Sequence, residues 1–428
     1  MSKKTIILPL ILVAMAFVSC EGPDPSQGQN EFSFVTLGEG DRISEVIDKD
    51  WSLDAKVGDT FLLGVTDGTD TWAWLDRYEW SVSDPAVATV YMGVLAVLQG
   101  GESTVTLKAE GYETTFTVSA PQTPHGKVFL TSDASQHHDE TGSFYPQYRH
   151  KLFVDGVMTG ETCHFVTAGK HGNLWQGAFA DGTISLKLNG RPVGSGIDFT
   201  NDFPGASFRE IVQAEAAGDR LVMILGSKSG HTYRIVSSDG SVMEGPIDGN
   251  VADVDEDSQG NITMWGLSYM VGTVWRISRD GTISKQNAPG DGHLIINAGL
   301  DDSGNEYVLC SLGDGDHVIF RNGDVLYRFQ NTFSPKMIIR GKDVLMAYFS
   351  TESDGNYAMY LFKNGESKRL AGGFLWSNSA DFDFCISTGG DPYVACHGVY
   401  GLCVFKDTAP ALLIPGSDFI SPSVAVID

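Results

Sequence analysis

A two-residue Asp-Gly or Asn-Gly turn recurs about every 40 residues from residue 155 onward, and no other feature constrains the fold as strongly. Each copy follows a short apolar stretch. The copies are Asp155-Gly156, Asn189-Gly190, Asp239-Gly240, Asp280-Gly281, Asn322-Gly323 and Asn364-Gly365, with Asp407-Thr408 as a degenerate seventh. Asp and Asn before Gly tolerate the positive φ values that two-residue hairpins require. Because a second set of turns alternates with these, each unit contains four short strands, which predicts a β-propeller.

The two ends of the repeat predict how the ring closes. The first unit has its second, third and fourth strands between residues 128 and 158, but nothing before them serves as its first strand. The residues 423–428 look like a first strand with no partner after it. Pairing the two ends would complete a seventh blade and remove the exposed edge of an open ring. We therefore expect seven blades over residues 126–428, with six as the alternative if residues 374–416 are irregular.

The turns of the fourth unit carry a recognisable pattern. A D-S-x-G-N turn is followed by an R-x-x-x-D-G-T segment, and the residues that carry them are Asp257, Ser258, Gly260, Asn261, Arg276, Asp280 and Gly281. This pattern resembles NHL-type and regulator-type β-propeller repeats, most closely in the fourth and fifth units. The resemblance implies architecture only, because such propellers host both enzymes and non-enzymes.

Residues 31–120 are predicted to form a separate β-sandwich, since 428 residues exceed one ordinary core and apolar residues alternate here between Gly and Asp-Pro turns. The segment resembles group 2 bacterial immunoglobulin-like domains, and the matching residues are Trp80, Ser81, Asp84, Val87, Ala88, Val90, Gly101, Val105 and Thr106. The aromatic stretch 72–75 and the position of Gly93 depart from the family pattern. The resemblance implies a spacer or adhesive module, joined to the propeller by a short linker at residues 121–126.

The first 20 residues are predicted to be a targeting segment. Two lysines precede an apolar run at residues 6–18, which is too short for a membrane-spanning helix of about 20 residues. The run ends at Phe17-Val18-Ser19-Cys20, which resembles bacterial lipoprotein signals, in particular those of the Bacteroides group, with Phe17 in place of the usual aliphatic residue. The resemblance implies lipidation of Cys20 and display at the outer membrane or cell surface, facing the periplasm or the exterior. Residues 21–30 have the composition of a flexible tether. An ordinary cleaved signal with an incidental cysteine is the alternative.

Charge and cysteine content narrow the partners. The formal net charge is −25, so the chain repels polyphosphate, and nucleic acid and anionic membrane surfaces are poor partners. No CxxC pair occurs among the five cysteines that follow Cys20, which are Cys163, Cys310, Cys385, Cys396 and Cys403. A zinc or thioredoxin-like site is therefore unsupported. We expect buried thiols, with a single disulfide among the last three cysteines as the alternative.

Motifs for catalysis and for metal binding are missing or incomplete. HExxH, GxSxG and Walker A sequences are absent. Residues 253–257 resemble the start of a calcium loop, but Ser258 and Met264 stand where Gly and Glu are required, so a solvated turn is expected. The cluster 137–140, His-His-Asp-Glu, is expected to be a polar surface loop because adjacent loop side chains seldom converge on one ion. No metal and no cofactor are expected.

Three aromatic residues occupy one repeated position. Trp175, Tyr307 and Tyr393 each lie shortly after the turn that joins the first two strands of a unit. A position that repeats in three units is better explained by packing between blades than by a ligand site.

The ligand-binding surface is expected where the repeat leaves the sequence unspecified. If the strands of each unit are called A to D in chain order, the D–A and B–C loops share one face of a propeller, and loops on a rigid scaffold carry binding sites. Aromatic residues with polar neighbours suit sugar recognition. The candidates are Tyr145, His138, Phe199, Asp202, Arg209, Tyr269, Trp376, His397 and Tyr400. The alternative is that these aromatic side chains plug the channel or cap the blades.

These expectations describe a lipid-anchored envelope protein that binds a glycan, or an envelope or host protein, without catalysis. The main alternative is a glycoside hydrolase or polysaccharide lyase with carboxylates at the channel mouth, for which two carboxyl groups about 5–10 Å apart are expected. A third hypothesis is a scaffold in which the propeller flank or residues 72–75 dock another envelope protein.

Overall fold

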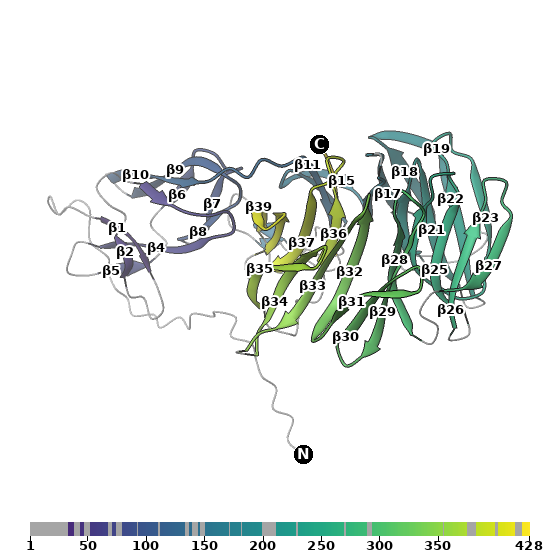
Figure 1. Cartoon of the computed structure of the whole chain (residues 1–428). Helices are drawn as coiled ribbons and strands as arrows, with labels where there is room; N and C mark the ends of the chain where they lie inside the picture. The colour runs from purple at the N-terminus through teal and green to yellow at the C-terminus, as the bar shows by residue number, and fades with distance from the viewer. Residues whose placement is uncertain are drawn as a thin grey trace, which may run out of the picture.

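The computed structural model describes most of the chain, and the described part consists of strands and turns with no helix (Figure 1). The described residues are 33–37, 43–46, 52–66, 71–73, 79–91, 93–109, 112–132, 137–138, 144–145, 150–170, 172–180, 182–198, 211–227, 230–268, 271–288, 293–353, 355–374, 382–398, 401–415 and 422–428. In these ranges, nothing helical has the length and apolar character that a membrane crossing needs.

Strands β1 to β10 form two sheets that pack around one core. The first contains, in spatial order, β2 (Ile43–Val46), β1 (Ser33–Leu37), β4 (Thr60–Thr66), β8 (Val94–Val97) and β7 (Ala88–Tyr91), with β5 (Thr71–Ala73) paired to β4. The second contains β3 (Ser52–Asp54), β10 (Tyr112–Ala120), β9 (Gly101–Ala109) and β6 (Glu79–Val82). Leu63 and Leu95 of the first sheet and Val105 and Phe116 of the second are fully buried in that core. Each sheet thus buries one face, which is the origin of the alternating apolar pattern.

Six four-stranded antiparallel sheets follow in chain order, each made of consecutive strands. They are β16 (Phe165–Ala168), β17 (Leu174–Ala180), β18 (Thr183–Leu188) and β19 (Arg191–Asp198); β20 (Ile211–Ala217), β21 (Arg220–Ser227), β22 (Gly230–Val236) and β23 (Val242–Ile247); β24 (Asn250–Glu256), β25 (Ile262–Ser268), β26 (Val271–Ile277) and β27 (Ile283–Asn287); β28 (Leu294–Leu300), β29 (Glu306–Gly313), β30 (Asp316–Arg321) and β31 (Asp324–Phe329); β32 (Thr332–Arg340), β33 (Asp343–Thr351), β34 (Tyr357–Lys363) and β35 (Glu366–Phe374); and β36 (Phe382–Ile386), β37 (Pro392–Gly398), β38 (Gly401–Lys406) and β39 (Ala409–Pro415).

A seventh four-stranded sheet joins the two ends of this region. Its order is β40 (Ser423–Ile427), β11 (Lys127–Thr131), β14 (Lys151–Val154) and β15 (Val157–Thr162). Strand β40 runs antiparallel to β11, with Val424 opposite Leu130 and Val426 opposite Val128, and all four side chains are buried. The pairing of the two ends that the sequence predicts is therefore confirmed.

The first strands of these sheets form a closed ring. β16 contacts β20, and the contacts continue through β24, β28, β32 and β36 to β40, which contacts β16 again. Sheets that radiate from such a ring have the arrangement of a β-propeller. The described region is all-β and propeller-like, and the ring encloses the channel discussed below.

The Asp-Gly and Asn-Gly turns contain two different conformations. Asn189 and Asn322 adopt positive φ values of 51° and 48°, and their Oδ1 atoms accept the backbone N–H of Leu174 and Glu306, at the start of strand B. At Asp280, by contrast, the positive φ belongs to Gly281, and the Asp carboxylate accepts hydrogen bonds inside its own turn. The Asn-Gly and Asp-Gly dipeptides compared here therefore close hairpins of different geometry, and only the first kind reaches back across the sheet.

The three repeated aromatic residues pack between sheets, as predicted. Trp175 is fully buried against Leu221 of the next sheet, and Tyr307 packs with Met337 of the sheet after its own. Tyr393 is fully buried in the cluster that also contains Val128. Each of these side chains therefore fills an interface between neighbouring sheets.

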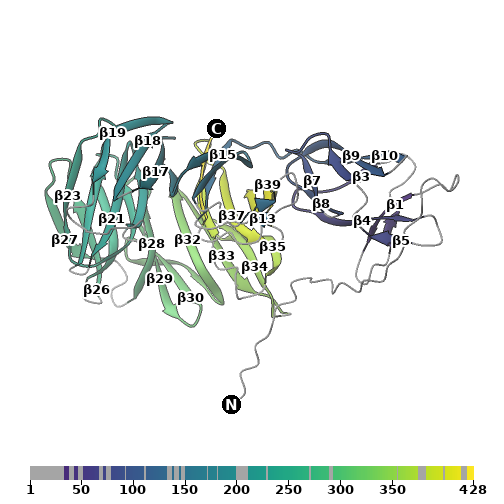
Figure 2. The same cartoon turned by 180° about the vertical axis from the view of Figure 1, so that it is seen from behind.

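The two-sheet unit contacts the outer strand of the last four-stranded sheet. Figures 1 and 2 both show β7 and β8 beside β39. The backbone N–H of Leu413 donates to the Leu98 carbonyl at 2.6 Å, and Gln99 forms an isolated antiparallel bridge with Leu412. This contact covers part of an edge strand that would otherwise offer unpaired backbone groups.

Candidate functional site

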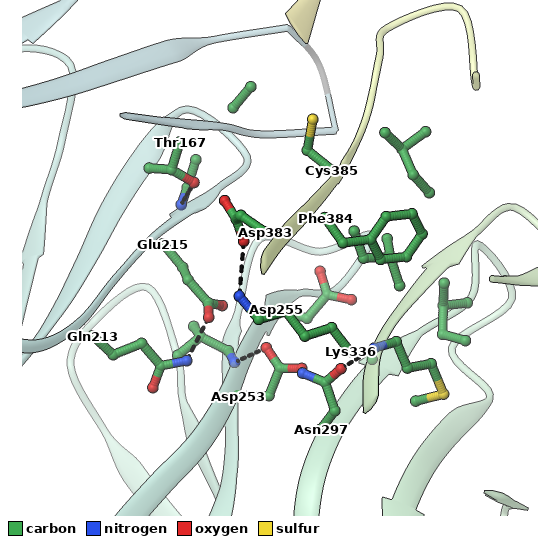
Figure 3. A pocket seen from close by; sticks show the side chains of 18 of the residues that line it. Thr167, Gln213, Glu215, Asp253, Asp255, Asn297, Lys336, Asp383, Phe384 and Cys385 are labelled. Carbon is green, nitrogen blue, oxygen red and sulfur yellow. Dashed lines mark hydrogen bonds and ion pairs between the residues drawn. The ribbon is translucent and has the colours of Figure 1, made fainter. Parts of the chain in front are cut away.

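The seven inner strands surround a cavity of about 590 Å³. Residues from β16, β20, β24, β28, β32, β36 and β40 all line it. Figure 3 shows the polar side chains of Glu215, Asp253, Asp255, Asn297 and Asp383 gathered around this space. A cavity of this size falls in the range of small-molecule sites, about 300–1,000 Å³, and it is the candidate functional site.

Most of the polar side chains around the cavity connect one inner strand to the next. Inner strands of neighbouring sheets share no ladder, so their channel-side N–H groups need other acceptors. The side-chain acceptors are Thr167 for Ala216 N–H at 3.2 Å, Asp253 for Ala298 N–H at 2.8 Å, Asn297 for Met337 N–H, Asp383 for Val424 N–H at 2.8 Å and Ser423 for Val166 N–H at 3.1 Å. Gln213 donates to the Ala252 carbonyl and Lys336 pairs with Asp383, which completes the circuit of seven connections.

This circuit corrects one sequence-based expectation. Residues 253–257 are not a solvated turn, since Asp253 and Asp255 lie on strand β24 and only Asp257 and Ser258 reach the turn. Asp253 is 7% exposed, and its Oδ2 accepts hydrogen bonds from the Ala298 N–H and the Asn297 side-chain amide. Asp255 Oδ2 similarly accepts the Leu300 N–H at 2.9 Å. The alternating carboxylates therefore fasten β24 to β28 instead of forming a calcium loop.

Glu215 and Asp253 form a carboxyl pair on one side of the cavity. The two side chains are hydrogen-bonded to each other. The side-chain amide of Gln213 also donates a hydrogen bond to Glu215. Burial raises the pKa of Glu215, and it raises the pKa of Asp253 well above its ordinary value, with repulsion from Glu215 as the next cause. Since two adjacent carboxylates cannot both ionise cheaply, the pair holds a proton to higher pH than an isolated carboxyl group does.

Two cations cross the end of the cavity that carries the A–B turns. Lys170 Nζ lies 2.7 Å from Asp255 Oδ2 and donates to the Leu300 carbonyl at 3.1 Å. The Arg340 guanidinium donates to the Lys170 carbonyl at 2.6 Å and to the Thr388 carbonyl at 3.1 Å. These contacts connect turns and strands from five different sheets.

The side of the cavity that is formed by β32 and β36 has more exposed polar side chains than the side that carries Glu215 and Asp253. Lys336 Nζ lies 3.0 Å from Asp383 Oδ1, and the two side chains are 45% and 22% exposed. Just before Lys336, a bulge interrupts β32, and within it Ser334 adopts a φ of 47°. Left-handed backbone at a residue other than Gly costs free energy and concentrates at functional sites. This side of the cavity, formed by β32 and β36, therefore has the polar groups that are best placed to meet a ligand.

The geometry bears on the two-carboxylate hypothesis. The carboxyl groups of Glu215 and Asp253 are in direct hydrogen-bonding contact, whereas glycosidases hold theirs at least about 5 Å apart. Asp253 is also occupied by two further donors on β28. Among the described residues, no group of three or more His, Cys, Asp and Glu side chains is arranged to hold a metal ion.

The residues proposed from the sequence as ligand contacts lie largely outside the described part of the chain. Phe199, Asp202, Arg209, Tyr269, Trp376, Tyr400 and the lipidation candidate Cys20 all fall there. His138 and Tyr145 lie on a two-stranded pairing of β12 (His137–His138) with β13 (Phe144–Tyr145), and His397 lies on β37. Residues 137–138 thus form a short paired strand within the stretch that the sequence predicted to be a polar surface loop.

Taken one at a time, the cavity residues carry no signal that sets them apart in the sequence. Asp253, Asn297 and Asp383 stand at one repeated place, four positions before the first turn residues Asp257, Asp301 and Ser387. The signal in the sequence is a polar residue that recurs at this position, within the otherwise apolar first strand of these four-stranded units.

The five described cysteines are free thiols. Cys163, Cys310 and Cys396 are buried, as predicted, and burial raises the pKa of Cys163 and of Cys310 to about 12. Cys396 and Cys403 lie directly opposite each other on β37 and β38. Buried thiols with raised pKa values are poor nucleophiles, so these residues act as core side chains.

No protein-family model matches the chain, and no curated protein matches it. Similar solved structures include a streptogramin B lyase, at 12% identity over 70% of this chain and 98% of that chain, with a TM-score of 0.39. A protein from Lactobacillus plantarum is 9% identical over 71% of this chain and 100% of its own, with a TM-score of 0.45. A quinonprotein alcohol dehydrogenase-like protein from Bacteroides thetaiotaomicron is 11% identical over 92% and 99%, with a TM-score of 0.36. The propeller-like fold rests on the sheet order described above, and the activities of those proteins are their own.

Proposed function

We propose that this chain is a lipid-anchored protein of the cell envelope that binds a glycan, or an envelope or host protein, without catalysis. Cys20 carries the lipid and residues 21–30 form the tether. The two-sheet unit is a bacterial immunoglobulin-like spacer, and the seven radiating sheets are the blades of a seven-bladed propeller. The ligand binds at the central cavity and the surrounding D–A and B–C loops.

One observation carries the choice of binding over catalysis. The carboxyl groups of Asp253 and Asp255 accept hydrogen bonds from the neighbouring inner strand, and Asp383 does the same toward β40. A general base or nucleophile needs a free lone pair directed at the substrate. Groups that hold the ring together are poorly suited to that task, whereas a rigid polar cavity suits recognition.

The test of this proposal is a binding screen on the folded, mature protein. We expect a glycan array or an affinity capture from envelope extracts to give a saturable ligand. The same preparation should release no new reducing ends or unsaturated products from polysaccharide substrates. Turnover that survives purification to homogeneity would contradict the proposal, as would the absence of any saturable ligand.

A carbohydrate-active enzyme is the second candidate, favoured by the 22% exposed Asp383 beside Lys336. In that case Asp383 would act on substrate and the Glu215–Asp253 pair would supply a protonated carboxyl group. Asp383→Asn keeps an acceptor for the Val424 N–H, so it separates chemistry from folding. Activity in the wild type that this variant loses, with an unchanged melting temperature, would favour the enzyme.

A further inference from the structure

The channel is divided into two cavities. Beyond the first lies a second, of about 850 Å³, lined by residues of the A–B turns. Lys170, Gly218 and Arg340 line both cavities, so they form the partition. A ligand in the first cavity therefore meets a floor at this end instead of an open pore.

The partition is firmly built. Lys170 belongs to the sheet of β16, yet its ammonium group contacts Asp255 on β24 and the Leu300 carbonyl on β28. Arg340, on β32, reaches the Lys170 carbonyl on the other side of the channel. The Lys170 side chain is 31% exposed and that of Asp255 is 12% exposed, so the carboxylate end of this ion pair is largely shielded from water. Because Lys170 and Arg340 both bond to strands or turns across the channel, the floor is held in place by the ring itself.

The formal charges around the first cavity nearly balance. Three cations line it, Lys170, Lys336 and Arg340, and so do four carboxyl groups, Glu215, Asp253, Asp255 and Asp383. Inside a chain of net charge −25, a cavity with such mixed charges gives neither a strongly acidic nor a strongly basic ligand a large electrostatic advantage.

We propose that this cavity is a pocket closed at the end that carries the A–B turns, and that it binds the uncharged terminal sugar of a glycan. The inference rests on the proposed function and deepens it. A closed floor excludes a polysaccharide threaded through the ring, so the cavity accepts a chain end. Ser334 and the Lys336–Asp383 pair supply donors and acceptors for sugar hydroxyls on the accessible side. A free monosaccharide presents the same chemistry as a chain end.

The closing experiment compares glycans that differ only in their ends. Linear neutral oligosaccharides of glucose, galactose, mannose, xylose and N-acetylglucosamine are tested by array and titration calorimetry. Each glycan that binds is then compared with its cyclic form, which has no chain end, where such a form exists. It is also compared with a version whose terminal residue is oxidised to the uronate. The methyl glycoside of the terminal residue is tested as a competitor. We expect the linear neutral glycan to bind, the methyl glycoside to compete, and the cyclic and oxidised forms to lose at least about tenfold in affinity.

The outcomes separate the two levels of the proposal. Equal binding of cyclic or internal segments, or a preference for the uronate, would overturn the end-binding pocket and leave the glycan-binding function standing. If none of the glycans binds, both the glycan ligand and the pocket proposal fail. If the linear oligosaccharide binds but the methyl glycoside of its terminal residue does not compete, the ligand is the end of a polymer and not a free sugar.

A pair of matched variants places the site. Ser334→Trp puts a large side chain at the cavity lining and should weaken binding of the best glycan by at least about tenfold. Ser303→Trp adds the same bulk at an exposed position in an A–B turn, at the other end of the channel, and should leave binding unchanged. Circular dichroism and melting temperature confirm folding of both. Equal loss in the two variants, or no loss in the first, would overturn the location, and the wild-type comparisons above test the pocket independently of any variant.

Discussion

The two sides of the central cavity use the same residue types for different purposes. On β20 and β24, Glu215, Asp253 and Asp255 are enclosed and accept hydrogen bonds from neighbouring strands. On β32 and β36, Lys336 and Asp383 also form a pair, but the Lys336 side chain is 45% exposed to solvent. Carboxylates in a channel therefore do not mark a catalytic centre by themselves. Asp383 also fastens β36 to β40 through the Val424 N–H, so the difference is that its lysine partner is accessible from the cavity.

The largest expected effect is the removal of Asp253. Asp253→Ala leaves the buried Ala298 N–H without its acceptor and deprives the Asn297 amide and Glu215 of a partner. Losing acceptors for buried donors should lower the free energy of unfolding by about 3 kcal/mol. Chemical denaturation measures this value. Asp253→Asn is the matched control, because its amide oxygen still accepts, and a loss as large as that of the alanine variant would contradict the role assigned to this side.

Opening the floor should have the next largest effect. Lys170→Met leaves Asp255 enclosed without its ammonium partner, so we expect a loss of about 2 kcal/mol in unfolding free energy. Lys285→Met removes a lysine from a more exposed pair with Asp248, whose side chains are 42% and 50% exposed. That control should cost less than about 1 kcal/mol. Similar losses in the two variants would show that the floor is no more important than a surface ion pair.

The carboxyl pair should make stability depend on pH. Burial raises the pKa of Glu215 and of Asp253 in the folded state, so the folded protein holds a proton that the unfolded chain releases. The contribution of this pair to stability is therefore fully present below the ordinary carboxyl pKa of about 4 and is lost as pH rises through the folded pKa, by at most about 1.4 kcal/mol per pH unit for each proton.

Glu215→Gln removes one of the two titrating groups and the repulsion that it exerts on Asp253. Unfolding free energies measured from pH 4 to pH 9 should decline less steeply in the variant than in the wild type. Asp239→Asn is a suitable control, since Asp239 is exposed in a turn and its pKa is lowered by hydrogen bonds with Ser241. Parallel curves for the wild type and Glu215→Gln would exclude the shared proton.

The smallest effect on stability is expected on the accessible side. Lys336→Ala removes a half-exposed ion pair, which should change the unfolding free energy by less than about 1 kcal/mol. Its effect on glycan affinity should be larger than its effect on stability, because the ammonium group faces the cavity that the ligand enters. Calorimetric titration and denaturation of the same sample compare the two. A large loss of stability with unchanged affinity would reverse the assignment of the two sides.

Much of the fold could be predicted because its causes are local. The positive φ at Asn189 and Asn322 is a preference of Asx before Gly, and strands between such turns are short and apolar. The ring closure followed from an unpaired strand at each end of the repeat, and β40 does pair with β11. Local reasoning did not distinguish the Asn turns, which cap strand B, from the Asp280 turn, which closes on itself.

The site could not be predicted in the same way, because its partners are distant in sequence. Asp253 bonds with the N–H of Ala298 and Asp255 with the ammonium group of Lys170, and no local pattern announces either contact. Alternating carboxylates near a turn therefore indicated a solvated loop.

The sequence by itself determined the turns, the short strands and the pairing of the chain ends, since these follow from backbone preferences over a few residues. Only the tertiary structure decided which polar side chains fasten the ring and which face the cavity. The physical reason is that inner strands of neighbouring sheets are brought together by ring closure, and each buried N–H then takes whichever acceptor the next strand presents. Asp253 and Asp383 thus occupy the same repeated position, while one is enclosed by Glu215 and Asn297 and the other remains beside an accessible lysine.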